Sequence, residues 1–388
     1  MRPSVVLKSQ DEAGFSRRQT PVSVATQVAR FLVGTVFIFS GLIKLNDPVG
    51  TQIKLEEYFE VFATDFGALH GVFHFLIPLA LPLAVLLCAA EVVLGVALLV
   101  QYRLRQTTWV LLGLIIFFTF LTFYSAYFNK VTDCGCFGDA IKLKPWQSFG
   151  KDVVLLGLIG FILVRLGDFR MATNQRVGSW VVGMATALSM GLGIYAIRHL
   201  PPVDLLPYRV GASIPAQMKP SAELRYLYQM EKDGKRVEFT KYPTDTTYHY
   251  QAMVLLNPEA QPKITDYAVW NNEGDFTRQT FEGARLVTVL ADVTRAAPSS
   301  LAAVGALAKA LEGSGVQPMV LTASDEKTFE HFRHQFQLAM PYYFADATVL
   351  KTIIRSNPGL VLLSNGTVKG KWHYHDLPSA AEVRKKLE

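Results

Sequence analysis

Five long apolar segments lie before residue 200 and restrict the fold more than any other feature of the chain. A bilayer core is crossed by about 20 residues of apolar helix, and these segments fit that length. Lipid offers the backbone no hydrogen-bond partners, so such segments form helices. We predict spanning helices at residues 22–45, 72–100, 107–128 and 178–197, and another that includes 153–164 and begins near Pro145.

The Lys and Arg residues between these segments predict an orientation, because cytoplasmic loops are enriched in positive charge. The N-terminal tail and the loops after the second and fourth segments share this enrichment, with Arg2, Lys8, Arg17, Arg18, Arg103, Arg105, Arg165, Arg170 and Arg176. We therefore expect residues 1–23 to form a cytoplasmic tail. Five crossings then place residues 207–388 outside the cytoplasm.

The first connection on the opposite side, residues 46–71, is expected to be partly helical. Its apolar side chains Leu55, Phe59, Phe62 and Phe66 recur at helical spacing. That spacing predicts an amphipathic helix at the membrane interface. A helix that only covers the mouth of the bundle fits the pattern equally well.

After the prolines near residue 201, the pattern changes to that of a soluble α/β domain. Strands and helices are predicted in the order β-α-β-α-β-β-α over residues 285–388, with a hairpin at Asn365-Gly366. This order, with Pro358 just before the hairpin, resembles a thioredoxin-like domain. Residues 266–281 similarly resemble the lead-in hairpin of its TlpA-like branch. The resemblance implies a cis-proline that faces a reactive turn.

The thioredoxin-like part nevertheless lacks the residues of thiol exchange. No cysteine follows residue 136 in the chain. The stretch at residues 294–298, where the resemblance places the reactive pair, therefore has no nucleophile. We expect this domain either to bind a partner or to be structural, because a fold alone does not fix a function.

Two cysteines, Cys134 and Cys136, are separated by a single glycine just after the third apolar segment. In an oxidising compartment they can close a small ring, because Gly135 has no Cβ to obstruct the turn. Such a disulfide closes almost no chain loop and is suited to exchange rather than to stabilisation. An inert structural turn is the main alternative. Metal binding is disfavoured, since no histidine is near.

Ionisable residues at membrane depth form a second candidate group. Glu91 lies inside the second segment and Asp152 inside the fourth, while Lys44 and Asp47 end the first. Charged residues in spans indicate either a functional pathway or buried ion pairs. A Lys44–Asp152 or a Lys151–Asp47 pair would tie the first and fourth helices together.

Other features narrow the functional classes. The net charge is +6, but the basic residues are scattered, which argues against a nucleic-acid partner. The sequence has no nucleotide-binding loop, hydrolytic triad, haem motif or metal cage, so we expect no cofactor and no metal. A membrane quinone is an alternative electron partner that no residue specifies. Cys88 is expected to be a packing residue, and His331, His334, His373 and His375 to be exposed.

Two stretches resemble known membrane proteins. The first is SGLIKLNDPVGTQIKLEEYFE at residues 40–60, which resembles DoxX-type proteins. The second is TDCGCFGD with the following LKPWQSFGKDVVLL, which resembles the related MauE branch of redox-associated membrane proteins. Residues 207–220 and 272–277 also resemble the C-terminal extension of a bacterial DoxX-family subgroup.

The resemblance implies an α-helical membrane bundle followed by an α/β thioredoxin-like domain at residues 207–388. The bundle would have a four-helix DoxX-like core at residues 24–170, with residues 178–197 as a fifth spanning helix. The resemblance also implies the inner membrane of a bacterium, with the α/β domain in the periplasm. It assigns Cys134 and Cys136 as the candidate redox pair, with Lys44 and Asp47 as the signature of the first span.

Two functions fit these observations. The first is an accessory component of a thiol–disulfide or quinone-linked oxidoreductase system, surrounded by lipid and serving an extracytoplasmic protein partner. The second is a non-enzymatic membrane scaffold that displays a binding domain. A variant that lacks both cysteines distinguishes them, because only the first function requires the pair.

Overall fold

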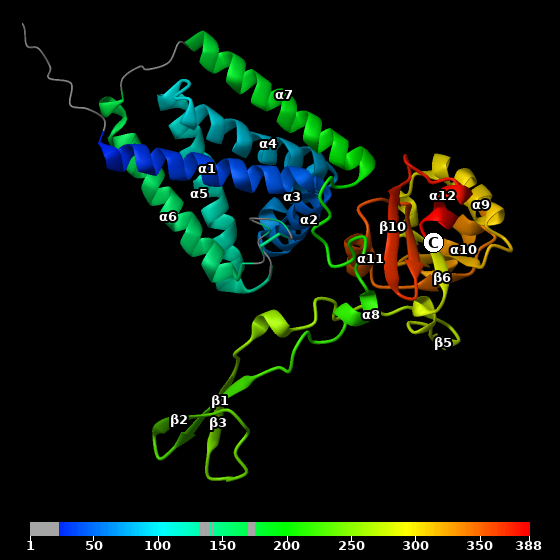
Figure 1. Cartoon of the computed structure of the whole chain (residues 1–388). Helices are drawn as coiled ribbons and strands as arrows, with labels where there is room; N and C mark the ends of the chain where they lie inside the picture. Colours follow the sequence, from blue (N-terminus) through cyan, green and yellow to red (C-terminus); the bar gives the residue numbers. More distant parts are fainter. Residues whose placement is uncertain (1–22, 132–134, 136–137, 139, 142, 170–174) are drawn as a thin grey trace, which may run out of the picture. The chain divides into compact units, whose positions relative to one another are not determined.

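The computed structural model of the protein describes residues 23–131, 135, 138, 140–141, 143–169 and 175–388 (Figure 1). Within these residues, five helical segments are long and apolar enough to cross a membrane. They are α1 (Val24–Asn46), Gly67–Leu99, α5 (Leu104–Phe128), α6 (Pro145–Val164) and α7 (Gln175–His199). The segment Gly67–Leu99 contains α3 (His70–Leu76) and α4 (Ala80–Leu99). The five predicted spans are therefore confirmed.

The chain divides into two compact units whose boundaries fall within α1, α4 and α7. The first unit comprises Met1–Ser40, Ala90–Cys134 and Leu143–Ala187. The second comprises Gly41–Ala89, Gly135–Lys142 and Leu188–Glu388.

The first unit is a helical bundle in which α1 and α4 approach closely. A Cβ added at Gly95 would lie 2.7 Å from the carbonyl oxygen of Gly34. Small residues at such crossings let helix backbones pack tightly in lipid. The core beneath this contact is made by Ala29, Val33, Phe37, Leu98, Leu111, Ile115, Leu155, Ile159 and Ile162.

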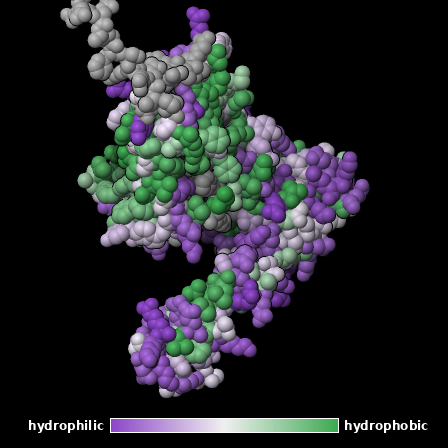
Figure 2. Space-filling model, turned by 60° about the vertical axis from the view of Figure 1, so that its left-hand side comes forward, coloured by the Kyte–Doolittle hydropathy of each residue, from purple (hydrophilic) through white to green (hydrophobic). Residues whose placement is uncertain are grey.

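The outer surface of the helices is apolar, as a lipid-facing surface requires. Figure 2 shows hydrophobic side chains spread over the helical part. Large apolar residues with more than half of their surface exposed include Phe31, Val154, Trp180 and Leu188. A water-soluble protein seldom exposes so wide an apolar surface, whereas helices in a bilayer do so along their length.

The second unit contains the helix expected within residues 46–71. This helix is α2 (Pro48–Asp65), which begins with Pro48 at its first position. Leu55 and Phe59 on α2 pack against Ala80 and Ala84 of α4. The apolar spacing read from the sequence therefore marks the buried side of a real helix.

The rest of the second unit is built mainly on a seven-stranded sheet with the order β10-β9-β6-β7-β8-β4-β5. Its strands are β4 (Trp270–Asn271), β5 (Gly274–Asp275), β6 (Ala284–Leu290), β7 (Val316–Thr322), β8 (Tyr342–Phe344), β9 (Gly359–Ser364) and β10 (Thr367–His373). β6, β7 and β8 are parallel, whereas β9 runs antiparallel to β6. This order is consistent with the thioredoxin-like expectation.

Helices cover both faces of this sheet. One face packs against α9 (Leu301–Ala310), α10 (Glu326–Gln335) and α12 (Ala380–Lys385). The opposite face packs against α8 (Ile214–Gln217) and α11 (Ala347–Ile353). Because the central strands are buried on both faces, they read as apolar runs in the sequence.

The hairpin predicted at Asn365-Gly366 is present, with left-handed φ angles of 47° and 73° at the two residues. The Asn357–Pro358 peptide bond is cis, as the resemblance implied. The sequence reading omitted β8 and α11, which are only three and seven residues long. Short elements carry too few periodic positions to be distinguished from loops.

A separate three-stranded sheet precedes the large one and was not predicted. Its strands are β1 (Tyr226–Lys232), β2 (Lys235–Phe239) and β3 (His249–Leu255), all antiparallel, with β1 in the centre. Most of its positions are half-buried or exposed. The turn at Asp233-Gly234, a dipeptide typical of two-residue hairpins, was the available signal.

Candidate functional site

The turn that carries the cysteine pair is described at Gly135, Gly138 and residues 140–141, whereas Cys134 and Cys136 lie outside the described residues. Gly135 and Gly138 have left-handed φ angles of 62° and 51°. The Gly138 N–H donates to the Gly135 carbonyl at 3.0 Å. Glycine adopts left-handed φ values without the steric cost that a Cβ imposes. Glycine at positions 135 and 138 therefore suits these backbone angles.

Gly135 also lies directly against α2. A Cβ at this position would be 3.3 Å from Cγ of Lys54, closer than most carbon contacts. Lys54 forms a further ion pair with Glu57 at 3.1 Å along the same helix. Glycine at position 135 thus has two effects. It allows Gly135 to approach α2 closely, and it allows the left-handed backbone conformation.

The start of the cysteine-bearing connection is fixed by the end of α5. Asn129 has a left-handed φ of 52°, and its N–H donates to the Ser125 carbonyl at 3.0 Å. The Ser125 hydroxyl donates to the carbonyl of Val131, which is fully buried. Val131 precedes Cys134 by three residues in the sequence. The chain therefore leaves the helix from an anchored point.

Asp152 is buried in the helical bundle and has two polar neighbours. Its side chain accepts a hydrogen bond from the Thr122 hydroxyl at 3.0 Å and pairs with the Lys151 ammonium at 2.5 Å. Thr122 lies on α5 and Asp152 on α6, so the contact ties these helices together. A buried carboxylate is tolerated only when it is paired and hydrogen-bonded.

The other predicted membrane-depth residues occupy separate places. Glu91 on α4 is 1% exposed, and Lys44 in the last turn of α1 is 7% exposed. The ion pairs described for the two aspartates are Asp47 with Arg355 and Asp152 with Lys151.

Cys88 is buried in α4, as its predicted packing role requires. Its sulfur lies 3.9 Å from the hydroxyl oxygen of Thr51 on α2. A buried cysteine of this kind behaves as a small apolar side chain.

Asp47 has two contacts at the start of α2. Its side chain accepts a hydrogen bond from the Gly50 N–H at 2.9 Å and so caps the helix. The same carboxylate accepts from Nε of Arg355 at 2.9 Å. The side chains of Arg355 and Asp47 are only 5% and 17% exposed, so this is a buried ion pair between α2 and the α/β domain.

A second ion pair joins α2 to the same domain. The Arg295 guanidinium donates to the Glu56 carboxylate at 3.3 Å. Arg295 belongs to the stretch at residues 294–298, where the thioredoxin-like resemblance places reactive cysteines. Because 58% of the Arg295 side chain is exposed, water and salt screen this pair.

The two loops that provide these arginines are bonded to each other. The Asn357 amide donates to the Asp292 carbonyl at 2.6 Å. The Ala297 N–H donates to the Asn357 carbonyl at 3.0 Å. The loop after β6 and the loop that contains the cis Pro358 therefore form one surface, which presents Arg295 and Arg355 together.

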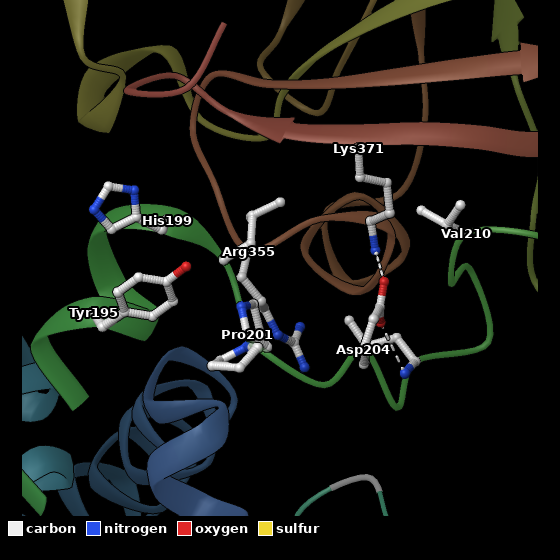
Figure 3. Close-up of a pocket in the computed structure, with 10 residues that line it drawn as sticks. Tyr195, His199, Pro201, Asp204, Val210, Arg355 and Lys371 are labelled. Carbon is white, nitrogen blue, oxygen red and sulfur yellow. Dashed lines mark hydrogen bonds and ion pairs between the residues drawn. The ribbon is translucent and has the colours of Figure 1, made fainter. Parts of the chain in front are cut away.

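A pocket of about 290 Å³ opens beside Arg355. Its lining includes Tyr195 and His199 from the end of α7, Asp204 from the following segment, and Lys371 from β10. Figure 3 shows the Lys371 and Asp204 side chains pointing toward each other, at 2.7 Å. Burial lowers the pKa of the Lys371 ammonium, and the charge of Asp204 partly offsets this effect. Each cation of this pocket thus already has a carboxylate partner.

His373 departs from the sequence expectation of an exposed histidine. It is 3% exposed, because it ends β10 within the large sheet. Burial lowers its pKa from 6.5 to about 4, and the neighbouring His375 acts in the same direction. His199 also lowers the pKa of His373, whereas Asp376 raises it. Burial is the largest effect and outweighs the effect of Asp376.

The buried His373 predicts a pH dependence of domain stability. Between about pH 4 and 6.5 the unfolded chain binds a proton that the folded domain does not, so stability falls as the pH falls through this range. The expected loss is about 2 kcal/mol once screening by solvent is allowed for. Urea unfolding of the α/β domain within the full chain, at pH 7 and pH 4.5, measures it. His373→Phe should flatten the profile, whereas the exposed His331→Phe should not.

Sequence reasoning identified Asp47 but did not identify its partner. Arg355, Arg295 and Glu56 were missed, because the pairs join residues 308 and 239 positions apart in the chain. The available signal was the position of the arginines: Arg295 lies in the stretch where the resemblance places a reactive pair, and Arg355 lies three residues before Pro358. Among the described residues, no three His, Cys, Asp or Glu side chains converge to hold a metal ion.

Residues 22–165 match the model of a family described as methylamine utilisation protein MauE. The matched region covers α1 to α6 and the connection that contains Cys134 and Cys136. No curated protein matches the chain.

Proposed function

We propose that the protein is a membrane-bound thiol–disulfide component, since residues 22–165 match the model of the MauE family, which is redox-associated. Cys134 and Cys136 form its redox pair. The observation that carries this proposal is the left-handed backbone of Gly135, the residue between the two cysteines in the sequence. A turn built on glycine lets neighbouring cysteine side chains meet and separate at low steric cost.

The exchange reaction follows from ordinary thiol chemistry. The Cys134 thiolate attacks the disulfide of a protein partner, and one partner thiolate leaves as the mixed disulfide forms. Cys136 then attacks the Cys134 sulfur, which closes the Cys134–Cys136 bond and releases the second partner thiolate. Two electrons pass to the partner, whose sulfurs take up the two protons that the cysteines lose. The reverse sequence oxidises the partner.

The α/β domain serves this chemistry without taking part in it. It has no cysteine, so electrons cannot pass through its own sulfur atoms. Its contribution is to dock a protein partner and to hold α2. The Lys54 side chain of α2 in turn contacts Gly135. A membrane quinone is the alternative electron partner and would be reduced to the quinol as the disulfide closes.

The compartment is part of the proposal. The positive residues of the tail and of two loops favour an N-terminus in the cytoplasm of a bacterium. With five spans, we expect the α/β domain and the cysteine pair to lie in the periplasm. Disulfides form and persist in that oxidising compartment, whereas the cytosol keeps thiols reduced.

Trapping of the mixed disulfide tests the proposal. Cys136→Ser removes the thiol that resolves the intermediate, so a covalent complex through Cys134 should accumulate and disappear on reduction. Non-reducing electrophoresis of membranes from cells that express the full chain detects it. Cys88→Ser is the matched control and should trap nothing. A Cys136→Ser variant that yields no reducible complex at normal membrane levels contradicts the proposal.

A non-enzymatic scaffold is the second candidate function. The thioredoxin-like shape without a nucleophile favours it, since such a domain retains a binding surface and loses the chemistry. Under this function a Cys134→Ser/Cys136→Ser variant supports growth and partner recovery as the unchanged chain does. Loss of either, with normal membrane levels, excludes the scaffold.

A further inference from the structure

We infer that α2 is the intramolecular ligand of the α/β domain, and that the surface presented by Arg295 and Arg355 recognises an acidic helix. The surface consists of the loop at residues 292–298 and the loop at residues 354–358. It corresponds to the reactive edge of the thioredoxin-like resemblance, but in this chain it carries two arginines instead of two cysteines. The inference goes beyond the proposed redox function and does not depend on it.

The contact between Arg355 and Asp47 is the main evidence that this surface binds α2. Its two side chains are nearly removed from solvent, and the guanidinium Nε lies 2.9 Å from the carboxylate. Arg355 also donates to the Lys351 carbonyl at 2.5 Å within its own domain. The hydrogen bond to Lys351 fixes the position of the Arg355 side chain independently of Asp47. A guanidinium fixed in this way selects for a partner with a carboxylate at the position of Asp47.

The shape of α2 fits this arginine closely. A Cβ at Gly50 would lie 3.2 Å from the outer nitrogen of Arg355 and 2.6 Å from the Asp47 carboxylate. A side chain at position 50 would crowd both the Asp47 carboxylate and the Arg355 guanidinium. Glycine therefore favours the contact, although it lowers the helix propensity of α2.

The second contact fixes the direction of the helix. Glu56 lies more than two turns beyond Asp47 and meets Arg295 at 3.3 Å. Two arginines on two loops thus hold two acidic residues of a single helix. Because the loops are bonded to each other through Asn357, they move as one surface rather than as independent contacts.

The occupied surface has a functional consequence. A protein that carries an acidic helix can bind this edge of the domain only after α2 has left it. Arg295 and Arg355 are accordingly positioning residues. They hold α2, and the Lys54 side chain of α2 lies against Gly135.

Hydrogen exchange of the full chain in lipid nanodiscs tests the inference. In Arg295→Glu/Arg355→Glu, amides of α2 and of residues 292–298 and 354–358 should exchange at least about tenfold faster, because both contacts become repulsive. Amides of β6 and β9 should keep their rates. Lys369→Glu, an exposed charge change on β10, is the matched control and should alter neither group.

A second variant addresses the case in which charge reversal unfolds the domain. Gly50→Leu changes only α2 and raises its helix propensity. It should nevertheless speed exchange in residues 292–298 and 354–358, because Arg355 loses its place over the helix. Unchanged protection of these loops in Gly50→Leu overturns the inference. So does a uniform increase across the whole domain in the arginine variant.

This outcome is separable from that of the redox proposal. Faster exchange with no trapped disulfide leaves the α2 contact standing and removes the thiol function. A trapped disulfide with unchanged exchange supports the thiol function and contradicts the α2 contact.

Discussion

Replacing Asp47 by alanine is expected to lower the free energy of opening of α2 by about 4–6 kcal/mol. Two effects add. Removing one partner of a buried ion pair costs about 3–5 kcal/mol, because Arg355 would keep its burial and lose its carboxylate. Losing the N-cap costs about 1 kcal/mol more, since the Gly50 N–H loses its acceptor. Opening free energies from hydrogen exchange in α2 measure the sum.

Asparagine at the same position separates the two effects. It is as good an N-cap as aspartate but carries no charge, so Asp47→Asn should cost about 1 kcal/mol less than Asp47→Ala. Glu60→Gln, which removes an exposed charge from α2, is the matched control and should change little. If Asp47→Asn behaves like the unchanged chain, the buried pair does not hold α2.

Replacing Asp152 by alanine is expected to weaken the α5–α6 contact by about 3 kcal/mol. The variant removes the carboxylate that both Thr122 and Lys151 approach, and leaves a lysine charge at membrane depth. We expect a lower thermal midpoint of the full chain in detergent and a lower level in membranes. Both can be measured by gel filtration after heating.

Threonine variants on α5 provide the controls for Asp152. Thr122→Val removes one hydrogen bond to the carboxylate and should cost about 1 kcal/mol. Thr119→Val is matched to it, because that hydroxyl bonds only to the Ile115 carbonyl of its own helix among the contacts described. Equal effects of the two valine variants would contradict a structural role of the Thr122–Asp152 contact.

Much of the architecture could be predicted from the sequence, because the strongest signals are physical requirements. Apolar length predicts the five spans, since only a helix satisfies the backbone of so long an apolar run in lipid. The start of α6 followed from Pro145, which suits the first position of a helix. The hairpin at Asn365-Gly366 followed from two residues that tolerate left-handed φ.

The candidate site could be predicted only in part, because its contacts join distant residues. Single charged residues such as Asp47 and Asp152 stand out in an apolar segment, but their partners do not. Arg355 lies in a soluble domain where an arginine is unremarkable, and only the fold brings it to α2. His373 was misjudged for the same reason: burial at the end of β10 is a property of the sheet, not of the local sequence.

Alkylation of Cys134 and Cys136 in intact cells tests the central claim most directly. A maleimide that cannot cross the inner membrane is applied before and after mild reduction, and the labelled chain is counted by its shift in mass. The thiol–disulfide proposal predicts little labelling at first and two labels per chain after reduction, with Cys88 labelled only after denaturation. Cysteines that stay unlabelled after reduction, while the α/β domain is open to an impermeant protease, contradict the proposal.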